Sequence, residues 1–249
     1  MRVGIVSRTD RERALEISRN ITEILKGKYE IFIDETLKSY FSQYKYSNKA
    51  GDVDFLISVG GDGTILKSVR RYKDTPILGV NMGKVGYLNE IPPESINLIP
   101  SILENHTIEE RSMISCKIGN RVVEALNDIV IRTEVATKVS QVKVEISGHD
   151  YVVTGDGVII TTPTGSTAYS FSAGGPILRT NSQVFGITPI CPLYRKSTPI
   201  VYPDHEKVVV TAMDRSCTIV ADGFSEGTMK RGDRIEINKS LLKTKFMKK

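Results

Sequence analysis

The sequence has few of the residues that build metal centres and disulfides, because its 249 residues include only three cysteines and three histidines. It also has no tryptophan. Cys116, Cys191 and Cys217 form no Cys-x-x-Cys pair, and the histidines form no His-Glu-x-x-His pair. These spacings argue against a disulfide framework and against a zinc site. We therefore expect buried free thiols, histidines at the surface or in turns, and no metal-binding residues.

Long apolar segments are also missing, because no run approaches the roughly 18 residues that a membrane-spanning helix needs. The first residues, MRVGIVSRTDRERALE, bring charge at once and contain no apolar core of a secretion signal. Hydrophobic residues make up 40% of the chain and charged residues 25%, which is ordinary for a globular protein. We therefore expect a cytoplasmic protein with no membrane partner.

The net charge of +5 is compatible with a phosphate-rich ligand or with weak nucleic-acid binding. The basic residues are dispersed, apart from the tail KTKFMKK at residues 243–249, and no aromatic-basic motif of a nucleic-acid-binding domain is present. We therefore expect no nucleic-acid partner. The tail is expected to be a solvated terminus or a segment that packs back on the first domain.

Three common nucleotide and nucleophile motifs are absent. The chain has no Gly-x-x-x-x-Gly-Lys-Ser/Thr phosphate loop and no Gly-x-Ser-x-Gly nucleophile turn. The first strand is followed by GIVSRTDRE, which lacks the Gly-x-Gly-x-x-Gly turn of dinucleotide-binding domains. Any nucleotide site must therefore be built from other loops.

The first 106 residues alternate between strand and helix patterns, which predicts a parallel, doubly wound α/β sheet. Strands are expected at residues 2–7, 29–35, 54–61 and 76–83, and helices at 11–27, 63–72 and 93–106, the last interrupted at Pro100. From residue 107 to 249 short β patterns dominate: hairpins at 111–134 and 141–162, then strands at 207–213, 217–222 and 233–238. The sequence thus predicts an α/β domain at 1–106 and a β-rich domain at 107–249.

The loop GGDGT, residues 60–64, lies where a buried strand should become a helix. Ligands of open α/β sheets sit beyond the carboxyl ends of strands, and backbone N–H groups at a helix start can hold phosphate oxygens. Asp62 could then orient or deprotonate a hydroxyl that attacks phosphorus, and Lys67 could reach a phosphate. The alternatives are an ordinary Asx turn at Asp62 and a solvated helix lysine at Lys67.

A second glycine-rich loop, GVNMGKVGYLNE at residues 79–90, follows the next buried strand. Two such loops at strand ends suggest one shared crevice, although a pair of tight turns is the alternative. Further along, Asn127 and Asp128 interrupt a strand pattern, where an amide and a carboxylate suit a purine amino group or ribose hydroxyls. The alternative for this pair is a bulge or a turn. Lys138, further along, could meet a phosphate, and the alternative is an ordinary surface lysine.

The segment TGDGVIITTPTGSTAYSFSAGG, residues 154–175, is dense in small donors around a turn. Tyr169 offers a ring for base stacking and Asp156 a carboxylate for a ribose or amide hydrogen. The polar side chains of the turn suggest a ligand-binding loop, because a purely structural loop rarely needs so many. A last motif, VADG at 220–223, is by itself typical of a hairpin turn.

Taken together, these motifs occur in the order found in the NAD kinase family, which the sequence resembles from about residue 54 to 223. The segments that carry the resemblance are GGDGT (60–64), GVNMGKVGYLNE (79–90), ALNDIVI (125–131), DGVIITTPTGSTAYSFSAGGP (156–176), PICP (189–192) and ADG (221–223). GGDGT alone also occurs in lipid kinases and phosphofructokinases. The TPTGSTAY block following the Gly-x-Asn-x-Gly-x-x-Gly-Tyr-Leu block is far more specific.

The resemblance implies an enzyme that transfers the γ-phosphoryl group of ATP, or of polyphosphate in some members, to the adenosine 2′-hydroxyl of NAD. It implies Mg²⁺ or another divalent cation and a homodimer or homotetramer. It also implies a Rossmann-like α/β N-terminal domain and a β-rich C-terminal domain, in agreement with the pattern of the two halves.

Carried onto this sequence, the resemblance makes Asp62 the catalytic carboxylate, as general base or hydroxyl orienter. It implies that the following residues contact the substrates: Gly63, Lys67, Asn127, Asp128, Lys138, Thr154, Asp156, Thr164, Thr167, Ala168, Tyr169, Ser170, Phe171 and Ser172. The sequence departs from the family at three positions. Asp128 stands where many relatives have glutamate, Leu193 where many bacterial members have histidine, and Phe224 where a polar residue is common.

Two other functions share some of these features. A lipid kinase would use the GGDGT chemistry, but it would need an apolar channel where this sequence has the polar TPTGSTAY loop. A non-catalytic nucleotide sensor would keep the adenosine pair and the loop without needing Asp62. Activity on NAD against lipid micelles tests the first, and NAD binding without ADP release would indicate the second.

Overall fold

The computed structural model describes residues 1–83, 86–135, 137–194 and 197–249. Contacts divide the chain into two compact units: unit 1 is Met1–Glu110 with Lys243–Lys249, and unit 2 is Arg111–Leu242. The division into domains at residue 106 stays a prediction. No helix among the described residues is long and apolar enough to span a membrane.

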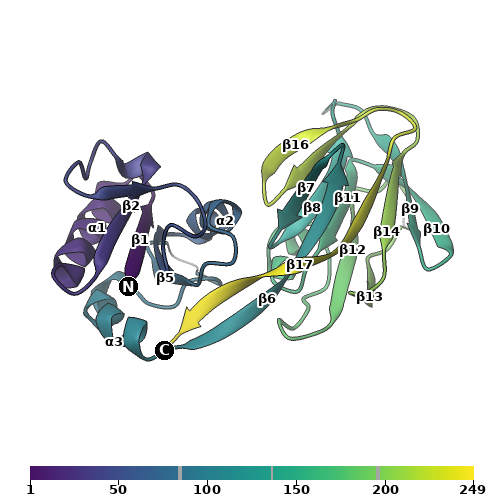
Figure 1. Cartoon of the computed structure of the whole chain (residues 1–249). Helices are drawn as coiled ribbons and strands as arrows, with labels where there is room; N and C mark the ends of the chain where they lie inside the picture. Colours follow the sequence, from purple (N-terminus) through teal and green to yellow (C-terminus); the bar gives the residue numbers. More distant parts are fainter. Residues whose placement is uncertain (84–85, 136, 195–196) are drawn as a thin grey trace. The chain divides into compact units, whose positions relative to one another are not determined.

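Unit 1 is built on a parallel sheet, and Figure 1 labels its strands β1, β2 and β5. The strands of the sheet are β1 (Arg2–Ser7), β2 (Glu30–Asp34), β3 (Lys45–Ser47), β4 (Phe55–Gly60) and β5 (Ile77–Asn81). The strand order is β5-β4-β1-β2-β3, and neighbouring strands run parallel. The chain reverses its direction of winding between β1 and β4, which is the point where sheets of this kind bind ligands.

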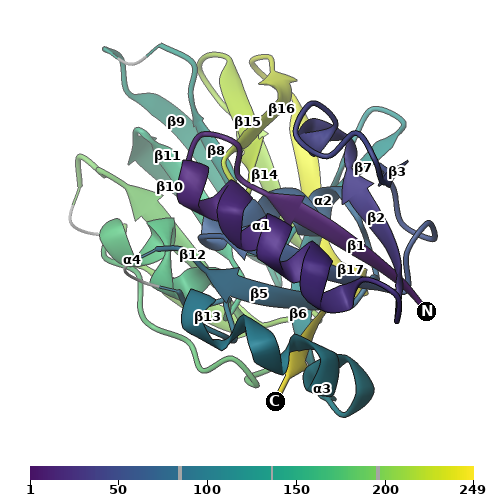
Figure 2. The same ribbon diagram turned by 90° about the vertical axis from the view of Figure 1, so that its left-hand side faces the viewer.

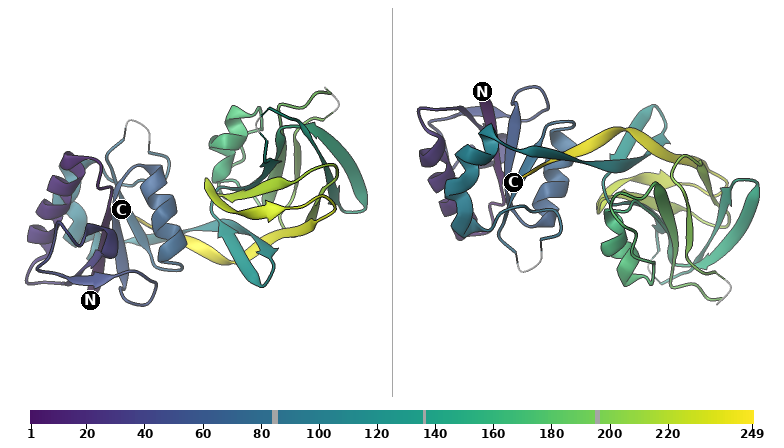
Figure 3. Two further views of the ribbon diagram at one scale, coloured as in Figure 1. Left: turned by 90° about the horizontal axis from the view of Figure 1, so that it is seen from above. Right: turned by 90° about the horizontal axis from the view of Figure 1, so that it is seen from below.

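Helices cover both faces of this sheet. They are α1 (Glu12–Leu25), α2 (Asp62–Arg71) and α3 (Ile99–Glu104), with short 3₁₀ helices η1 (Glu35–Leu37) and η2 (Pro93–Leu98). Figure 2 shows α1 lying along the strands of unit 1, and Figure 3 shows α1 and α2 on opposite sides of them. Because both faces are covered, the inner strands β1, β4 and β5 are mostly apolar, and Ile5, Ile33 and Ile57 are fully buried.

The elements expected in this half are confirmed, with two refinements. The expected helix at 93–106 is divided at Ile99, where η2 gives way to α3 and Pro100 occupies the first turn of the new helix. This placement suits proline, which lacks the N–H that a helix interior would need. Strand β3 was not expected, because its three residues, Lys45–Ser47, carry no apolar pattern.

Unit 2 is a sandwich of two antiparallel sheets with one core between them. Its strands are β6 (Thr107–Ile118), β7 (Arg121–Ala125), β8 (Asp128–Thr133), β9 (Ser140–Ile146), β10 (His149–Gly155), β11 (Gly157–Thr161), β12 (Val184–Ile190), β13 (Ile200–Pro203), β14 (Val208–Ala212), β15 (Cys217–Ala221), β16 (Phe224–Met229) and β17 (Arg234–Lys248). One sheet has the order β13-β12-β11-β8-β15-β16, and the other holds β10-β9-β14-β17 together with the β6–β7 pair. A short 3₁₀ helix, η3 (Gly165–Thr167), and α4 (Tyr169–Ser172) follow β11.

The expected hairpin around Gly119 is confirmed as β6–β7. The segment 141–162 forms a hairpin only as far as Gly155, because β9 pairs with β10 while β11 belongs to the other sheet. The turn between β10 and β11 therefore passes the chain from one sheet to the other. This change of sheet places the start of the TPTGSTAY block beside β8, as described below.

Of the two alternatives for the tail, the structure shows the second and not a solvated terminus. The tail is the end of β17, and Phe246 and Met247 are 3% and 1% exposed in unit 1. Lys248 Nζ also lies 2.7 Å from Glu90 Oε2. Of the cysteines, Cys116 and Cys217 are buried as expected, but Cys191 is exposed.

Candidate active site

The GGDGT loop joins the end of β4 to the start of α2 within two residues. A Cβ atom added to Gly60 would lie 2.2 Å from Thr64 Oγ1, so this tight entry into the helix needs glycine. Beside Gly61 and Gly63 an added Cβ would meet nothing within 4 Å, so open space borders the backbone there. The positive end of the α2 dipole faces the same loop, which favours an anion such as a phosphate.

Asp62 is the first residue of α2, and its carboxylate is held by a segment more than twenty residues further along the chain. The backbone N–H of Leu88 donates to Oδ1 at 3.2 Å, and that of Tyr87 donates to Oδ2 at 3.3 Å. The side-chain amide of Asn89 adds a third hydrogen bond, from Nδ2 to Oδ1 at 3.0 Å. Asp62 is therefore a fixed carboxylate, and the Asx-turn alternative does not describe these contacts.

The second glycine-rich loop meets the first, as expected from their positions at neighbouring strand ends. The backbone N–H of Met82 donates to the carbonyl of Gly60 at 2.9 Å, and the N–H of Glu90 donates to that of Gly79 at 3.0 Å. Residues 84–85 of this motif lie outside the described residues. After the loop, Ile91 pairs with Val80 of β5 in the parallel direction. This pairing places Tyr87, Leu88 and Asn89 against the start of α2.

The other two predicted residues of unit 1 differ in their placement. Gly63 directly follows Asp62 and is exposed beside the open space. Lys67 is exposed on α2, five residues after Asp62, which places it about 140° around the helix from Asp62. The structure therefore brings Gly63 to the carboxylate, whereas a phosphate contact for Lys67 stays a prediction.

In unit 2, Asn127 and Asp128 stand at the start of β8, between two neighbouring strands. Asp128 is opposite Thr161 at the end of β11, and the next residue, Ile129, is opposite Ala221 at the end of β15. The loop after β11 and the turn after β15 therefore flank this pair. The sequence alone could not show that these two distant motifs adjoin the Asn-Asp pair.

Asp222 has a larger role than the hairpin turn that its motif suggests. Its carboxylate accepts hydrogen bonds from the backbone N–H groups of Leu126 at 2.8 Å, Asn127 at 2.7 Å and Asp128 at 3.3 Å. Asp222 also has a positive φ of 49°, and Gly223 follows with a φ of 83°. This turn thus fixes the backbone that carries the Asn-Asp pair.

The TPTG turn holds the same backbone from the other side. Thr162 Oγ1 donates to the carbonyl of Leu126 at 2.6 Å, and the N–H of Thr162 donates to the carbonyl of Asn127 at 2.9 Å. A Cβ atom added to Gly165 would lie 2.1 Å from the Asn127 carbonyl oxygen. Glycine is therefore required at 165 because the two backbones touch, and not because of its φ.

Burial gives Asp128 an unusual ionisation. The residue is 5% exposed, and no described residue donates a hydrogen bond to its carboxylate. Desolvation, with a smaller contribution from the negative charge of Asp222, raises the pKa of Asp128 to about 7. Near neutral pH this group can therefore donate a hydrogen bond in one protonation state and accept one in the other.

Several small hydroxyls of the TPTGSTAY block are used inside the fold, which corrects the argument that their density alone indicates a ligand. Ser166 Oγ donates to the carbonyl of Pro163 at 2.7 Å, and Ser170 Oγ lies 2.9 Å from Thr188 Oγ1 of β12. Both serines are fully buried. Thr164 is 8% exposed, and a ligand contact for Thr164 or Ser170 stays a prediction.

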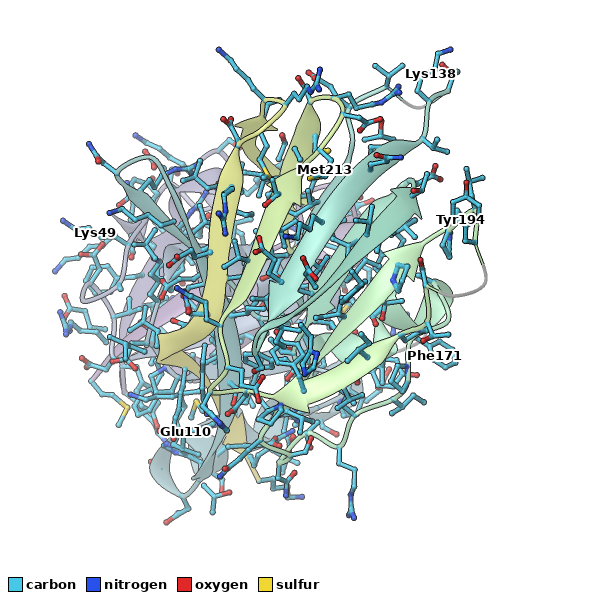
Figure 4. The ribbon with its side chains drawn as sticks, turned by 90° about the vertical axis from the view of Figure 1, so that its right-hand side faces the viewer. Lys49, Glu110, Lys138, Phe171, Tyr194 and Met213 are labelled. Atoms are coloured by element: carbon cyan, nitrogen blue, oxygen red, sulfur yellow. The ribbon has the colours of Figure 1, made fainter. Side chains whose placement is uncertain are left out.

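The exposed part of this block is the helix α4 and the residues beside it. Tyr169 and Phe171 are 41% and 55% exposed, Ser172 is exposed, and Thr167 and Ala168 are half-buried. Figure 4 shows Phe171 at the outer surface of the unit. Two aromatic rings, of Tyr169 and Phe171, are therefore accessible at this part of the surface.

The remaining predicted residues lie elsewhere in unit 2. Thr154 and Asp156 are half-buried at the end of β10, where the backbone N–H of Asp156 donates to the Ile190 carbonyl at 2.9 Å. Lys138 is exposed, and Figure 4 shows it far from Phe171 on the same unit. Leu193, at one of the departures from the family, is 60% exposed. The structure does not bring Lys138 to the α4 segment.

Among residues 1–83, 86–135, 137–194 and 197–249, no group of three or more His, Cys, Asp or Glu side chains could hold a metal ion. The described side chains therefore do not form a protein cage for Mg²⁺. Mg²⁺ is commonly held by one or two carboxylates together with substrate phosphates, so the donor set suits only that mode of binding.

Comparison with known proteins follows the same two halves. The ATP-NAD kinase N-terminal domain matches residues 3–108, and the ATP-NAD kinase C-terminal domain matches residues 126–249. An NAD kinase from Thermococcus sibiricus is 37% identical over 259 residues, covering 100% of this chain and 94% of the relative. An NAD kinase from Pyrococcus abyssi is 36% identical over 260 residues, with the same coverage.

Two solved structures share the fold. The structure of an NAD kinase from Archaeoglobus fulgidus in complex with ATP is 30% identical, with a TM-score of 0.81, and covers 99% of this chain and 93% of that chain. The structure of yeast NADH kinase complexed with NADH has a TM-score of 0.91 and covers 100% of this chain and 83% of that chain. At 23% identity the yeast protein supports the fold alone.

Proposed function

The chain belongs to the NAD kinase family, and we propose that Asp62 serves the adenosine 2′-hydroxyl of NAD while that hydroxyl receives the γ-phosphoryl group of ATP. As a member of this family it is a phosphotransferase that makes NADP from NAD and ATP. The observation that carries the role of Asp62 is its fixed carboxylate at the start of α2, beside the open space at Gly61 and Gly63.

In the proposed reaction the 2′-oxygen of NAD forms a bond to the γ-phosphorus of ATP while the bond from that phosphorus to the β,γ-bridging oxygen breaks. ADP leaves, and the hydroxyl proton passes to the Asp62 carboxylate and then to solvent. Phosphoryl transfer depends mainly on positioning and charge stabilisation. The fixed carboxylate of Asp62 supplies positioning, and the positive end of the α2 dipole contributes to charge stabilisation.

For NAD binding we propose that Asn127 and Asp128 hold the adenosine. The amide and the carboxyl group offer both donors and acceptors, and the clamp from Asp222 and Thr162 fixes their backbone. We propose that Tyr169 stacks on a base, and the 41% exposure of this residue supports that role. Further contacts are proposed from Lys138, Thr154, Asp156, Thr164, Thr167, Ala168, Ser170, Phe171 and Ser172.

For the phosphates we propose contacts from Gly63 and Lys67. A divalent cation, Mg²⁺ or another, would supply charge neutralisation at the phosphates, held through their oxygens because the described side chains form no cage for it. Polyphosphate is a second donor that the same site could accept. We further propose that the enzyme works in the cytoplasm as a homodimer or homotetramer.

The test is NADP formation from NAD, ATP and Mg²⁺ by the wild type and by Asp62→Asn, with polyphosphate as an alternative donor. General-base assistance contributes roughly 10²–10⁴-fold, so turnover should fall by at least that range while NAD affinity measured by calorimetry stays nearly unchanged. Asp54→Asn is a matched control, because Asp54 precedes the other end of β4 and bonds Arg2. Unchanged turnover in Asp62→Asn would remove the proposed role.

A further inference from the structure

We infer that Asn89 is a positioning residue for Asp62, an inference that rests on the proposed role of that carboxylate. Asn89 lies two residues before Ile91, which pairs with β5, and its Nδ2 donates to Asp62 Oδ1 at 3.0 Å. It is the side-chain member of the three donors, whereas Tyr87 and Leu88 use backbone N–H groups. A substitution at 89 can therefore remove one hydrogen bond and leave the other two in place.

The orientation of the Asn89 amide supports this role. An ionised carboxylate only accepts hydrogen bonds, so the amide must present its NH₂ group to Asp62. The amide oxygen is then directed to a buried place where, among the residues that the structure describes, it has no hydrogen-bond partner. A buried acceptor without a partner disfavours folding, so the fold gains little from this side chain and Asp62 gains a donor.

The neighbouring glycine makes room for the amide. A Cβ atom added to Gly79 would lie 2.7 Å from Asn89 Oδ1 and 2.9 Å from Asn89 Cα. Any other residue at 79 would push the 89 side chain away from Asp62. Gly79 and Asn89 therefore belong to one arrangement, which explains why the second motif begins with glycine at this point.

The three hydrogen bonds treat the two carboxylate oxygens unequally. Oδ1 accepts from both Leu88 and Asn89, whereas Oδ2 accepts only from Tyr87, at 3.3 Å, among the described residues. Oδ2 therefore keeps the greater free capacity to accept a proton. Asn89 stabilises the rotation of the carboxylate that leaves Oδ2 for the substrate hydroxyl, without touching the substrate itself.

The experiment compares Asn89→Ala with the wild type in NADP formation and in thermal unfolding. A hydrogen bond to a charged group corresponds to roughly 10- to 100-fold, so kcat should fall by that range while KM for NAD changes less than about twofold. The melting temperature should not fall, because the substitution also removes the unpartnered oxygen. Asn48→Ala is the matched control, since Asn48 bonds the exposed Glu35 carboxylate and should leave kcat unchanged.

Two further variants separate positioning from a structural effect. Asn89→Asp keeps the size but replaces the donor with a second negative charge, so kcat should fall further than in Asn89→Ala. In an Asp62→Asn background, Asn89→Ala should change kcat less than about twofold, because the group that it positions is already lost. A parallel fall in melting temperature and kcat would overturn the inference by making Asn89 a structural residue.

The outcomes distinguish this inference from the proposed function. If Asp62→Asn loses turnover and Asn89→Ala keeps wild-type kcat, Asp62 serves the reaction and the positioning role is wrong. If Asp62→Asn keeps turnover, the proposed role of Asp62 fails, and the role of Asn89 fails with it. A loss in both single variants, with a non-additive double variant and an unchanged melting temperature, supports both.

Discussion

Replacing Asp128 with asparagine should remove a pH dependence from the stability of the protein. In the folded protein Asp128 is 5% exposed, and burial together with Asp222 raises its pKa to about 7, from an ordinary value of 3.8. The folded state therefore keeps the Asp128 proton at pH values where the unfolded chain has released it. This contribution to stability is fully present below about pH 4 and is lost as the pH rises through about 7.

The magnitude follows from the size of the pKa change. Each pH unit between the unfolded and folded pKa values lowers the free energy of unfolding by about 1.4 kcal/mol for one group. Between about pH 5 and pH 8 the wild type should therefore lose roughly 2–3 kcal/mol through Asp128, most of it below pH 7. Asp128→Asn has no titrating group at this position, so its free energy of unfolding should fall by that much less over the same pH range.

The assay is urea unfolding of both proteins at about pH 5 and pH 8. The result is how much more the free energy of unfolding falls between these pH values in the wild type than in Asp128→Asn. Asp150→Asn in the same unit is the control. The hydrogen bond from Lys143 lowers the pKa of Asp150, so this carboxylate stays ionised throughout the range. The same pH dependence in wild type and Asp128→Asn would refute the reasoning, because it would mean that Asp128 ionises in the folded state without a penalty.

Two other predictions concern the same part of unit 2. Asp222→Ala should lower the free energy of unfolding by about 3–6 kcal/mol in urea titrations, because three backbone N–H groups lose one shared acceptor; a loss below about 1 kcal/mol would show that water replaces it. Gly165→Ala should weaken NAD binding at least about tenfold in calorimetry, because its Cβ would lie 2.1 Å from the Asn127 carbonyl and displace the loop. Wild-type affinity would show that the contact can relax.

Periodicity and buried apolar runs predicted most of unit 1, because its strands are covered on both faces and its helices have one apolar face. The same reasoning missed the C-terminal part of β17, beyond the strand expected at 233–238. There Ser240, Thr244, Phe246 and Met247 are buried, whereas Lys239, Leu241 and Lys243 are exposed. Small hydroxyl residues hide such a pattern, so the segment resembled a solvated basic tail.

The site could be predicted residue by residue only where a motif carried the chemistry, as at Asp62. The role of Asn89 depends on a hydrogen bond across 27 residues of sequence, and that of Asp222 on bonds across 94 to 96 residues. Neither contact has a local signal, because both follow from strand ends that the fold brings together. The small hydroxyls show the opposite difficulty: the density of serine and threonine suggested a ligand, but Ser166 and Ser170 bond Pro163 and Thr188 inside the fold.

In both units a carboxylate accepts hydrogen bonds from backbone N–H groups of a distant segment, but the carboxylate has a different role in each. In unit 1 a carboxylate with a proposed chemical role, Asp62, is held by donors from residues 87–89. In unit 2 the carboxylate of Asp222 fixes the backbone of residues 126–128. That backbone carries the Asn-Asp pair proposed to bind the substrate. The same chemical change should therefore act differently: Asp62→Asn should cost turnover and little stability, whereas Asp222→Asn should cost stability first and NAD affinity with it. Finding stability and turnover affected in the same proportion in both variants would contradict this division of roles.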